Sequence, residues 1–501
     1  MQFQKLSISF MLILTIILSL AIGLGCTPRV LIASNLLPNV SPEMEKPEFW
    51  IKKIQNPGRL LLTPEEIQKM NEENLKGQDL YLCRVKDLKE EWTKEEILTL
   101  LDEDWKGFGR TEEVRYGRYG YPLEEPFWNE LKKNLNQESL KDRNRIFFGL
   151  IVKRTDIRVF PTEEIFMNTP TNYEFDRFQH SSISPGSLIG IYHFSKDRLW
   201  AYVQTGFIRG WVRTTALAIA KEKNEAVDYE EAKERLVITG NFVKVFGDPS
   251  LHQIIFLAQM GTTFPILSLP CTSPVPSRCR ASPAPSWYRG NTVQGLPGKT
   301  GITDQCYIIQ IPFREVDGEL TFRKGYIPKD EDVRQGFLPY TQENLARQAF
   351  KMLYQPYGWG EMFGARDCSR FIMDIFATFG ILMPRNSQLQ ARVGVSLGQV
   401  EGMTIKEKQK VLDRAIPLAT TLRLPGHIML YLGKDKGKYY VIHNIWGIQK
   451  AGWFGPVLEK IGKVVVSDLS LGRSVPYQSL LHRIAGIQLI VSDSEVQRKF
   501  P

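Results

Sequence analysis

The sequence predicts a multidomain protein with an N-terminal mainly helical region, two small all-β barrels and a C-terminal α+β domain. Its 501 residues suffice for three or four domains at roughly 100–200 residues each, and 43% hydrophobic residues exclude a wholly disordered or fibrous chain. Between residues 146 and 335, short apolar runs alternate with turn signals, as in small β-barrels. Between residues 340 and 493, two helical patterns precede four strand-like runs.

Charge and cysteine content narrow the classes of partner. The net charge of +9 is mild for this length, and no Lys/Arg block is dense enough to predict nucleic-acid binding. The balance suits an anionic surface such as a cell wall or lipid headgroups. Six cysteines are too few for a disulfide scaffold, and they lack the spacing of a zinc finger.

Residues 1–26 read as an export signal. Lys5 is the only charge before Cys26, and the apolar run 10–24 is too short for a confident membrane-spanning helix. The ending Gly23-Leu24-Gly25-Cys26 resembles a bacterial lipoprotein signal, in which Cys26 is acylated, although Leu is usual at position 23. Plain secretion and a retained anchor helix are the alternatives. Residues 27–501 are expected to be extracytoplasmic, on the periplasmic face, possibly at the outer membrane, if the source is diderm.

Residues 27–145 are predicted to form an N-terminal helical and irregular domain. Thr63 and Thr93 each precede acidic residues in the pattern of a helix N-cap, and Glu96 is placed for a capping box. We see no reactive cluster here and interpret the region as a packing or spacer domain.

Two barrels are predicted, in residues 146–222 and 235–335. The runs TDIRVFPT, SPGSLIGIYHFSKDRLWAYVQT and GWV of the first resemble bacterial SH3-like domains. A Pro-rich insertion, 268–300, interrupts the second and is predicted to be a long loop. It carries Cys271 and Cys279, which either form a disulfide or remain free thiols.

The domain predicted for residues 340–493 begins with two helices. The first runs from Thr341 to Tyr354, and the second starts near Cys368, with Asp367 as its N-cap and Gly380 after its end. Strands are predicted at 427–432, 439–446, 462–466 and 487–491.

Cys368 is the candidate nucleophile. In the first turn of a helix, backbone N–H groups point at the sulfur and the helix dipole favours thiolate over thiol. The alternative is a small buried cysteine that fills the helix face.

Two of the six histidines lie on one predicted hairpin. If Lys434–Lys436 forms the loop, His427 faces His443 directly on one side of the sheet. A base and its orienting partner need that geometry, since one imidazole takes the thiol proton and the other fixes its tautomer. A metal site lacks a carboxylate here, and purely structural histidines are the remaining alternative.

Several motifs of residues 340–493 together resemble the NlpC/P60 family of papain-like cysteine peptidases. They are Tyr357-Gly358-Trp359-Gly360, Asp367-Cys368-Ser369, Leu382–Ser387, and Pro425-Gly426-His427-Ile428 with the later His443. The resemblance implies that Cys368 is the nucleophile, His427 the general base and then acid, and His443 the third triad member. Tyr357 and the Cys368 amide would stabilise the oxyanion.

The resemblance gives further side chains a role beside the nucleophile. Asp367 caps the helix and, in SH3-containing members, this position also binds the free α-amine of L-Ala. Ser369 either bonds the substrate or serves the first helical turn. Arg366 and Arg370 either attract substrate carboxylates or are solvated surface charges, and we favour the second interpretation.

The barrel is expected to add an acid and a tyrosine to the amine site. Tyr192 and Tyr202 are weak candidates, and we interpret them as structural aromatics.

The resemblance implies a cell-wall endopeptidase. Its bond would be D-γ-glutamyl–diamino acid in peptidoglycan stem peptides that begin with free L-Ala, with no metal or cofactor required. The alternatives are a non-catalytic SH3-type peptidoglycan-binding lipoprotein, and an amidase or acyltransferase on the same papain-like scaffold.

Overall fold

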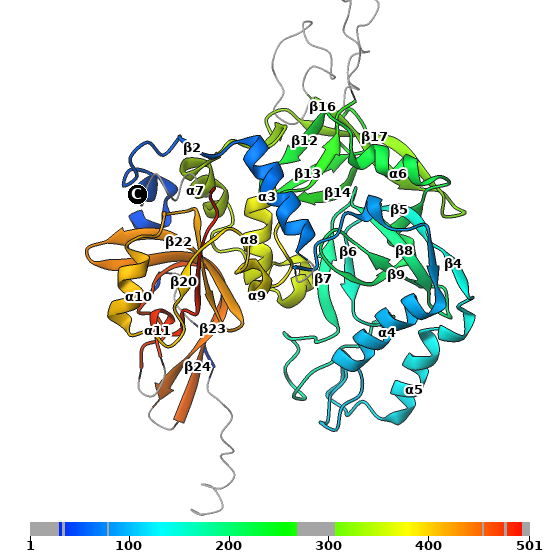
Figure 1. The fold of residues 1–501 in the computed structure, drawn as a ribbon, viewed down its shortest axis with the longest axis horizontal. Helices are drawn as coiled ribbons and strands as arrows, with labels where there is room; N and C mark the ends of the chain where they lie inside the picture. The colour runs from blue at the N-terminus through cyan, green and yellow to red at the C-terminus, as the bar shows by residue number, and fades with distance from the viewer. Residues whose placement is uncertain are drawn as a thin grey trace, which may run out of the picture.

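The computed structural model describes residues 30–32, 36–77, 80–267, 306–452, 455–474 and 478–492. The export signal with Cys26 and the Pro-rich insertion with Cys271 and Cys279 lie outside these residues. Within the described ranges, no helix is both long and apolar enough to span a bilayer. The predicted fold class is confirmed: the chain is multidomain, with β-barrels followed by a C-terminal α+β domain (Figure 1).

The predicted helix starts at Thr63 and Thr93 are confirmed. Thr63 caps α3 and Thr93 caps α4, each in a reciprocal capping box with the Glu three residues later. The elements of this region are η1 (Pro42–Glu45), α2 (Pro47–Ile51), β2 (Leu60–Leu62), α3 (Pro64–Lys76), η3 (Val85–Asp87), β3 (Glu91–Thr93), α4 (Lys94–Phe108), α5 (Glu125–Asn134), η4 (Gln137–Ser139) and β4 (Arg143–Arg145).

The described part of the N-terminal region is divided between two cores. Trp50 and Leu62 are buried in the core of the C-terminal domain. Ile97, Leu101 and Trp128 are buried in the core of the first barrel. Helices α3 and α4 therefore belong to different packing units, and the region predicted as one domain joins the barrel to the C-terminal domain.

The first barrel is a seven-stranded sheet in the order β11-β5-β8-β9-β10-β6-β7. Its strands are β5 (Phe147–Ile151), β6 (Thr155–Arg158), β7 (Gln179–Ile183), β8 (Leu188–Phe194), β9 (Trp200–Gln204), β10 (Arg209–Arg213) and β11 (Leu217–Ile219), with η5 (Thr214–Ala216). Tyr192 and Tyr202 are buried in its core, and the Tyr202 hydroxyl donates to Asp104 at 2.5 Å. Both tyrosines are structural, as interpreted.

The second barrel is split into two small sheets around one apolar core. Their orders are β15-β12-β18 and β14-β13-β17-β16. Its strands are β12 (Arg235–Ile238), β13 (Phe242–Phe246), β14 (Ile254–Gln259), β15 (Thr263–Pro265), β16 (Cys306–Arg314), β17 (Leu320–Pro328) and β18 (Val333–Gln335). Helix α6 (Lys223–Glu230), which precedes them, packs on β5 and β8 of the first barrel.

The C-terminal domain packs helices against a seven-stranded sheet, ordered β1-β24-β23-β22-β21-β25-β20. Its strands are β1 (Val30–Ile32), β20 (Val395–Gln399), β21 (Thr420–Leu424), β22 (His427–Asp435), β23 (Lys438–Gly452), β24 (Gly455–Asp468) and β25 (Gly486–Leu489), and β19 (Tyr340–Thr341) pairs with β2. Its helices are α7 (Gln342–Phe350), η8 (Trp359–Gly364), α8 (Cys368–Ala377), α9 (Ser387–Gln390), α10 (Ile405–Leu412) and α11 (Leu480–Arg483).

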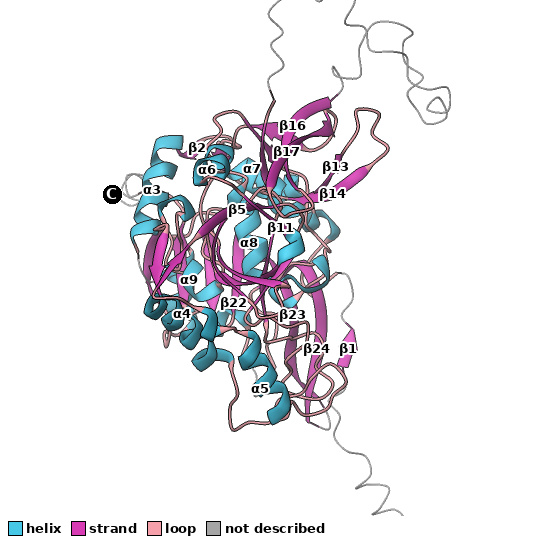
Figure 2. Ribbon diagram, turned by 90° about the vertical axis from the view of Figure 1, so that its right-hand side faces the viewer, coloured by secondary structure: helices cyan, strands magenta, loops and turns pink. Residues whose placement is uncertain are grey.

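The central helix α8 connects the C-terminal sheet to the barrels. One side packs on β22 and β23, and Figure 1 shows α8 and α9 between the orange strands of that sheet and the first barrel. Figure 2 shows β23 and β24 as a long hairpin beside β1. Helix α7 ends at Phe350, earlier than predicted, because the chain turns through Tyr354 at a φ of 66°.

Candidate active site

Cys368 is the first residue of α8, as predicted. The Asp367 carboxylate caps this helix by accepting from the backbone N–H of Arg370 at 2.8 Å. The thiol is only 7% exposed. It accepts hydrogen bonds from the backbone N–H groups of Ile428 and Ser369, so that the sulfur lies against the start of β22.

Opposing effects act on the protonation of this sulfur. Burial, followed by the negative charge of Asp367, raises the pKa of the Cys368 thiol to about 12. The two backbone N–H groups and the Arg385 charge act in the opposite direction but do not overcome it. At neutral pH the substrate-free site therefore holds a thiol, and the helix dipole alone does not produce a thiolate.

His427 and His443 form a hydrogen-bonded chain that begins at the first residue of β22, next to Ile428, whose backbone N–H binds the sulfur. Nε2 of His427 lies 2.8 Å from Nδ1 of His443, whose Nε2 lies 3.0 Å from the Ser467 hydroxyl. Because Nε2 of His427 is committed to His443, Nδ1 is the ring nitrogen that remains for another partner. Ser467, which sequence reasoning missed, extends the chain to β24 and fixes the His443 ring.

The predicted register of the hairpin is wrong, although the two histidines do share a face. The turn lies at Lys436 and Gly437, between the paired residues Asp435 and Lys438, and not at Lys434–Lys436. That register alone would put the two rings on opposite faces, since side chains alternate along a strand.

A β-bulge corrects the parity. Leu432 is an extra residue between the pairs Tyr431↔Val441 and Gly433↔Tyr440. Beyond the bulge the register shifts by one residue, so His427 and His443 return to the same face as diagonal neighbours, with ring centroids 5.1 Å apart. Gly433 has a φ of 129°, which favours glycine.

Both imidazoles are held neutral. Burial and the charge of Arg483 lower the pKa of His427 to about 3, against an opposing effect of Asp367. Burial and His427 lower the pKa of His443 well below its usual value. The resting pair is therefore thiol and neutral imidazole, which suits general-base removal of the thiol proton once a substrate arrives.

Tyr357 lies in the loop that precedes α8. Its backbone N–H donates to the Gly462 carbonyl at 2.8 Å, which ties the loop to β24. Burial, Cys368 and Asp367 raise the pKa of its hydroxyl, so Tyr357 is a protonated donor near the sulfur. Trp359 packs against Phe175 of the first barrel, with ring centroids 5.3 Å apart.

Ser369 and Asp367 both bind Arg385, to which the sequence analysis assigned no role. Arg385 donates to Asp367 at 2.7 and 3.2 Å and to the Ser369 hydroxyl at 2.8 Å. It also donates to Ser181 of β7 at 2.6 Å. The motif Pro384-Arg385 was noticed in the sequence, but only the fold places its side chain here.

The interpretation of Arg366 and Arg370 as solvated charges is wrong. They are 2% and 6% exposed and both bind Asp374, at 2.5 Å each. Arg370 also binds Glu361 at 2.9 Å.

Glu361 anchors these charges to the first barrel. Its fully buried carboxylate accepts from the hydroxyls of Ser181 and Ser182 at 2.7 and 2.8 Å. Burial opposes its ionisation, but Arg370, Arg385 and Arg154 lower its pKa to about 2. Sequence reasoning missed Glu361, which carries no local signal of burial.

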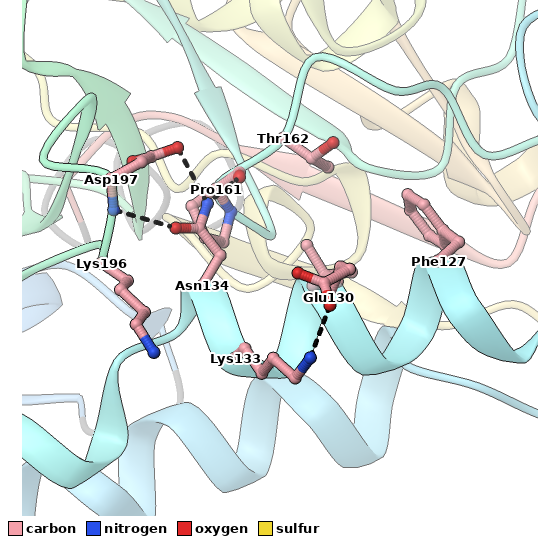
Figure 3. Close-up of a pocket in the computed structure, with 9 residues that line it drawn as sticks. Phe127, Glu130, Lys133, Asn134, Pro161, Thr162, Lys196 and Asp197 are labelled. Atoms are coloured by element: carbon pink, nitrogen blue, oxygen red, sulfur yellow. Dashed lines mark hydrogen bonds and ion pairs between the residues drawn. The ribbon is translucent and has the colours of Figure 1, made fainter.

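A surface pocket of about 520 Å³ lies between α5 and loops of the first barrel (Figure 3). Its lining, Phe127, Glu130, Leu131, Lys133, Asn134, Pro161, Thr162, Lys196 and Asp197, includes none of the predicted site residues. Glu130 pairs with Lys133 and Asn134 with Asp197, so polar groups of the pocket bind one another. In the part of the chain that the structure describes, no group of three His, Cys, Asp or Glu side chains could hold a metal ion.

Two family models match the chain. Residues 354–445 match the NlpC/P60 family, and residues 165–213 match an SH3 domain of the SH3b1 type. The NlpC/P60 match contains Tyr357, Cys368, His427 and His443. A search of curated proteins found no match.

One solved structure shares the fold of most of this chain. An NlpC/P60 endopeptidase from Photobacterium damselae subsp. piscicida has a TM-score of 0.68 at 18% identity, over 92% of this chain and 99% of its own. An NlpC/P60 family protein from Bacillus cereus ATCC 10987 covers 69% of this chain and 100% of its own, with 15% identity and a TM-score of 0.42. The first of these likenesses extends through the barrels as well as the C-terminal domain.

Proposed function

We propose that this chain, which contains an NlpC/P60 domain preceded by an SH3 domain of the SH3b1 type, is a cysteine endopeptidase that acts on bacterial cell-wall peptides. One observation carries the proposal. The Cys368 thiol lies at the N-terminus of α8 against the start of β22, where His427 is linked to His443 and Ser467. A nucleophile, a base and an oriented partner are the set that acyl transfer through a thioester requires.

The proposed reaction begins with a proton transfer. Nδ1 of His427 takes the thiol proton as the sulfur attacks the scissile carbonyl carbon. The tetrahedral oxyanion accepts hydrogen bonds from the Tyr357 hydroxyl and the Cys368 backbone N–H. The same imidazole then protonates the leaving amine, and the C–N bond breaks to leave a thioester. A water molecule, deprotonated by His427, releases the acid and restores the thiol.

The bond we propose is D-γ-glutamyl–diamino acid, in stem peptides whose first residue is L-Ala with a free amine. The family resemblance of the sequence supports this choice. The carboxylate of Asp367 would bind that ammonium. Because Arg385 already pairs with Asp367, the ammonium would share a carboxylate whose charge is partly offset.

Digestion of purified muropeptides tests the reaction and its rivals. Free L-Ala and N-acetylmuramoyl-L-Ala versions of one defined peptide are compared by mass spectrometry, with Cys368→Ala as control. Cleavage after D-Glu in the free peptide only is the expected result. Cleavage before L-Ala in the muramoyl peptide would identify an amidase, and release or transfer of an acyl group from phospholipid vesicles in a parallel assay would identify a lipid-directed enzyme. Wall binding by wild type and Cys368→Ala, with no cleavage by either, would identify a binding protein.

We infer that Cys26 is acylated and anchors the protein on the extracytoplasmic side of a bacterial membrane. The apolar run that ends at Gly25-Cys26 supports this. Each buried methylene of an acyl chain contributes about 0.8 kcal/mol, so several chains would hold the protein stably. Metabolic labelling with a radioactive fatty acid should label the wild-type protein and leave Cys26→Ser unlabelled. A wild-type protein without label would contradict acyl anchoring.

A further inference from the structure

We propose that Arg177, on the loop before β7 of the first barrel, binds a carboxylate of the substrate peptide beside Tyr357. This inference rests on the proposed peptidase function and names a specificity-determining contact for it. Four observations support it: the docking of the loop, the unpaired guanidinium, a second cation behind it, and the chemistry of the peptide.

The loop that carries Arg177 is docked on the C-terminal domain. Phe175 packs between Trp359 and Trp446, with ring centroids 5.3 and 4.8 Å away. Glu174 accepts from Nε1 of Trp446 at 3.2 Å and from Lys460 at 2.5 Å. Trp359 comes two residues after Tyr357, and Trp446 three residues after His443, so this loop lies beside the strands and turn that carry the candidate catalytic groups.

The Arg177 guanidinium is held in place without a carboxylate partner. The guanidinium stacks on the Trp359 ring at 4.8 Å, and the backbone N–H of Arg177 donates to the Phe166 carbonyl at 2.8 Å. It is half-buried and interacts electrostatically with the Tyr357 hydroxyl. Among the described residues, no salt bridge to Arg177 is formed.

The other buried arginines near this interface have the carboxylate partner that Arg177 lacks among the described residues. Each of them has a carboxylate oxygen within hydrogen-bond distance: Arg158 with Asp176 at 2.7 Å, Arg366 and Arg370 with Asp374 at 2.5 Å, and Arg385 with Asp367 at 2.7 Å. A partly desolvated guanidinium without such a partner is costly unless a ligand supplies it.

A second arginine, Arg115, interacts electrostatically with Arg177. Arg115 stacks on Phe166 at 5.7 Å, and Tyr116 next to it pairs with Met167. Its Nε is buried without an acceptor, although its terminal nitrogen binds Glu113. Burial, followed by the charge of Arg115, lowers the pKa of Arg177. Two like charges in a partly buried site favour the approach of an anion.

The substrate class supplies that anion. A D-glutamate that is linked through its γ-carbonyl keeps a free α-carboxylate close to the scissile bond, and the diamino acid carries a second carboxylate on the other side. The planar guanidinium matches the two oxygens of either group. The shared chemistry is thus a carboxylate within a few bonds of the scissile amide.

Steady-state kinetics of Arg177→Gln distinguish the two carboxylates. The substrates are L-Ala-γ-D-Glu-diaminopimelate, its D-isoglutamine form, and its form with the diamino-acid α-carboxylate amidated. For the free tripeptide we expect KM to rise about tenfold or more, as for loss of a charged hydrogen bond, with kcat within about twofold of wild type. The amidated form that already lacks the recognised carboxylate should be insensitive to the substitution.

Arg213→Gln is the matched control. Arg213 is in the same barrel, stacks on Trp200 at 4.2 Å and pairs with Glu163, so it tests the loss of a stacked guanidinium as such. It should leave KM unchanged for all three peptides. An equal loss on every peptide for Arg177→Gln would show a structural role and overturn the inference.

Calorimetric binding to the Cys368→Ala protein separates this inference from the proposed reaction. If Cys368→Ala binds the free tripeptide and the double variant with Arg177→Gln binds it about tenfold more weakly or worse, the carboxylate contact stands even if the wild type cleaves nothing. If the wild type cleaves the peptide but both inactive proteins bind it alike, the reaction stands and the contact is overturned. Failure of Cys368→Ala to bind the free tripeptide also overturns the contact.

Discussion

The two sides of α8 differ in the charge of the side chains that they carry. On the side of β22, the Cys368 thiol and the two histidines are held neutral in the substrate-free site. On the side of the barrels, Arg370 and Asp374 are buried and bind one another, Arg370 also binds Glu361, and Asp374 accepts from Gln259 of β14. One helix thus has a neutral surface toward β22 and an ionic surface toward the barrels.

Asp367 joins the two sides. Its carboxylate caps α8 through the Arg370 backbone and pairs with Arg385, which also binds Ser181 of the barrel. The position of the Cys368 sulfur therefore depends on how the barrel docks. The comparison predicts that substitutions on the neutral side change the reaction and leave folding intact, whereas substitutions on the ionic side change stability first.

The largest effect is expected from Cys368→Ala. Loss of the nucleophile should lower cleavage of a defined muropeptide by about 10⁴-fold or more. The urea midpoint should stay close to that of wild type, because only one small buried atom is removed. Residual cleavage near the wild-type rate would show that another group performs the reaction and would remove the basis of the comparison.

Glu361→Ala should be the most damaging change on the ionic side. It removes one of the two carboxylates that bind Arg370 and the acceptor that two serines of β7 share, and removal of one partner of a buried ion pair costs about 3–5 kcal/mol. Urea unfolding measures this loss. Glu130→Ala, at an exposed pair with Lys133, is the control and should leave the urea midpoint close to that of wild type. Similar midpoints for the two variants would contradict a structural network.

Tyr357→Phe tests the proposed oxyanion donor on the neutral side. Deletion of one hydroxyl donor should lower kcat about 10²-fold, because the oxyanion forms only during the reaction. KM and the urea midpoint should change little, since the ring and its packing remain. A larger KM with unchanged kcat would place the hydroxyl in ground-state binding instead.

The sequence predicts the neutral side of α8 better than the ionic side. Cys368 at a capped helix start, and two histidines on one hairpin, are local patterns, and the sequence was enough to predict them. The shared face of His427 and His443 was predicted from a wrong turn, because a single-residue bulge at Leu432 has no clear sequence signal. Arg366, Arg370 and Glu361 look like surface charges, and only the docking of the barrels makes them buried.

The fold divides similarly. The N-cap patterns at Thr63 and Thr93 are local, and they predicted both helix starts correctly. Which core each helix joins was not predictable, because α3 and α4 are both amphipathic and their partners lie far away in sequence. Sequence patterns therefore missed the residues whose packing or ion pairs depend on partners far away in the sequence.

The smallest effect concerns pH and the neutrality of the histidines. In the folded protein the pKa of His427 is lowered to about 3 and that of His443 well below its usual value, whereas an unfolded histidine titrates near pH 6.5. Between these values the unfolded chain binds more protons, so the stability that these groups contribute is present above about pH 6.5 and is lost as the pH falls.

His443→Gln removes one of these titrations while keeping a side chain that can hydrogen-bond to His427 and Ser467. The free energy of unfolding should then fall less steeply between about pH 6 and 4, by up to about 1.4 kcal/mol per pH unit. His193→Gln is the comparison, because burial lowers the pKa of His193 in the first barrel, away from the thiol. It should also flatten the pH dependence of stability but leave cleavage unchanged. If His443→Gln leaves the slope as steep as in wild type, His443 is already charged in the folded protein, and the neutral side of α8 is not neutral.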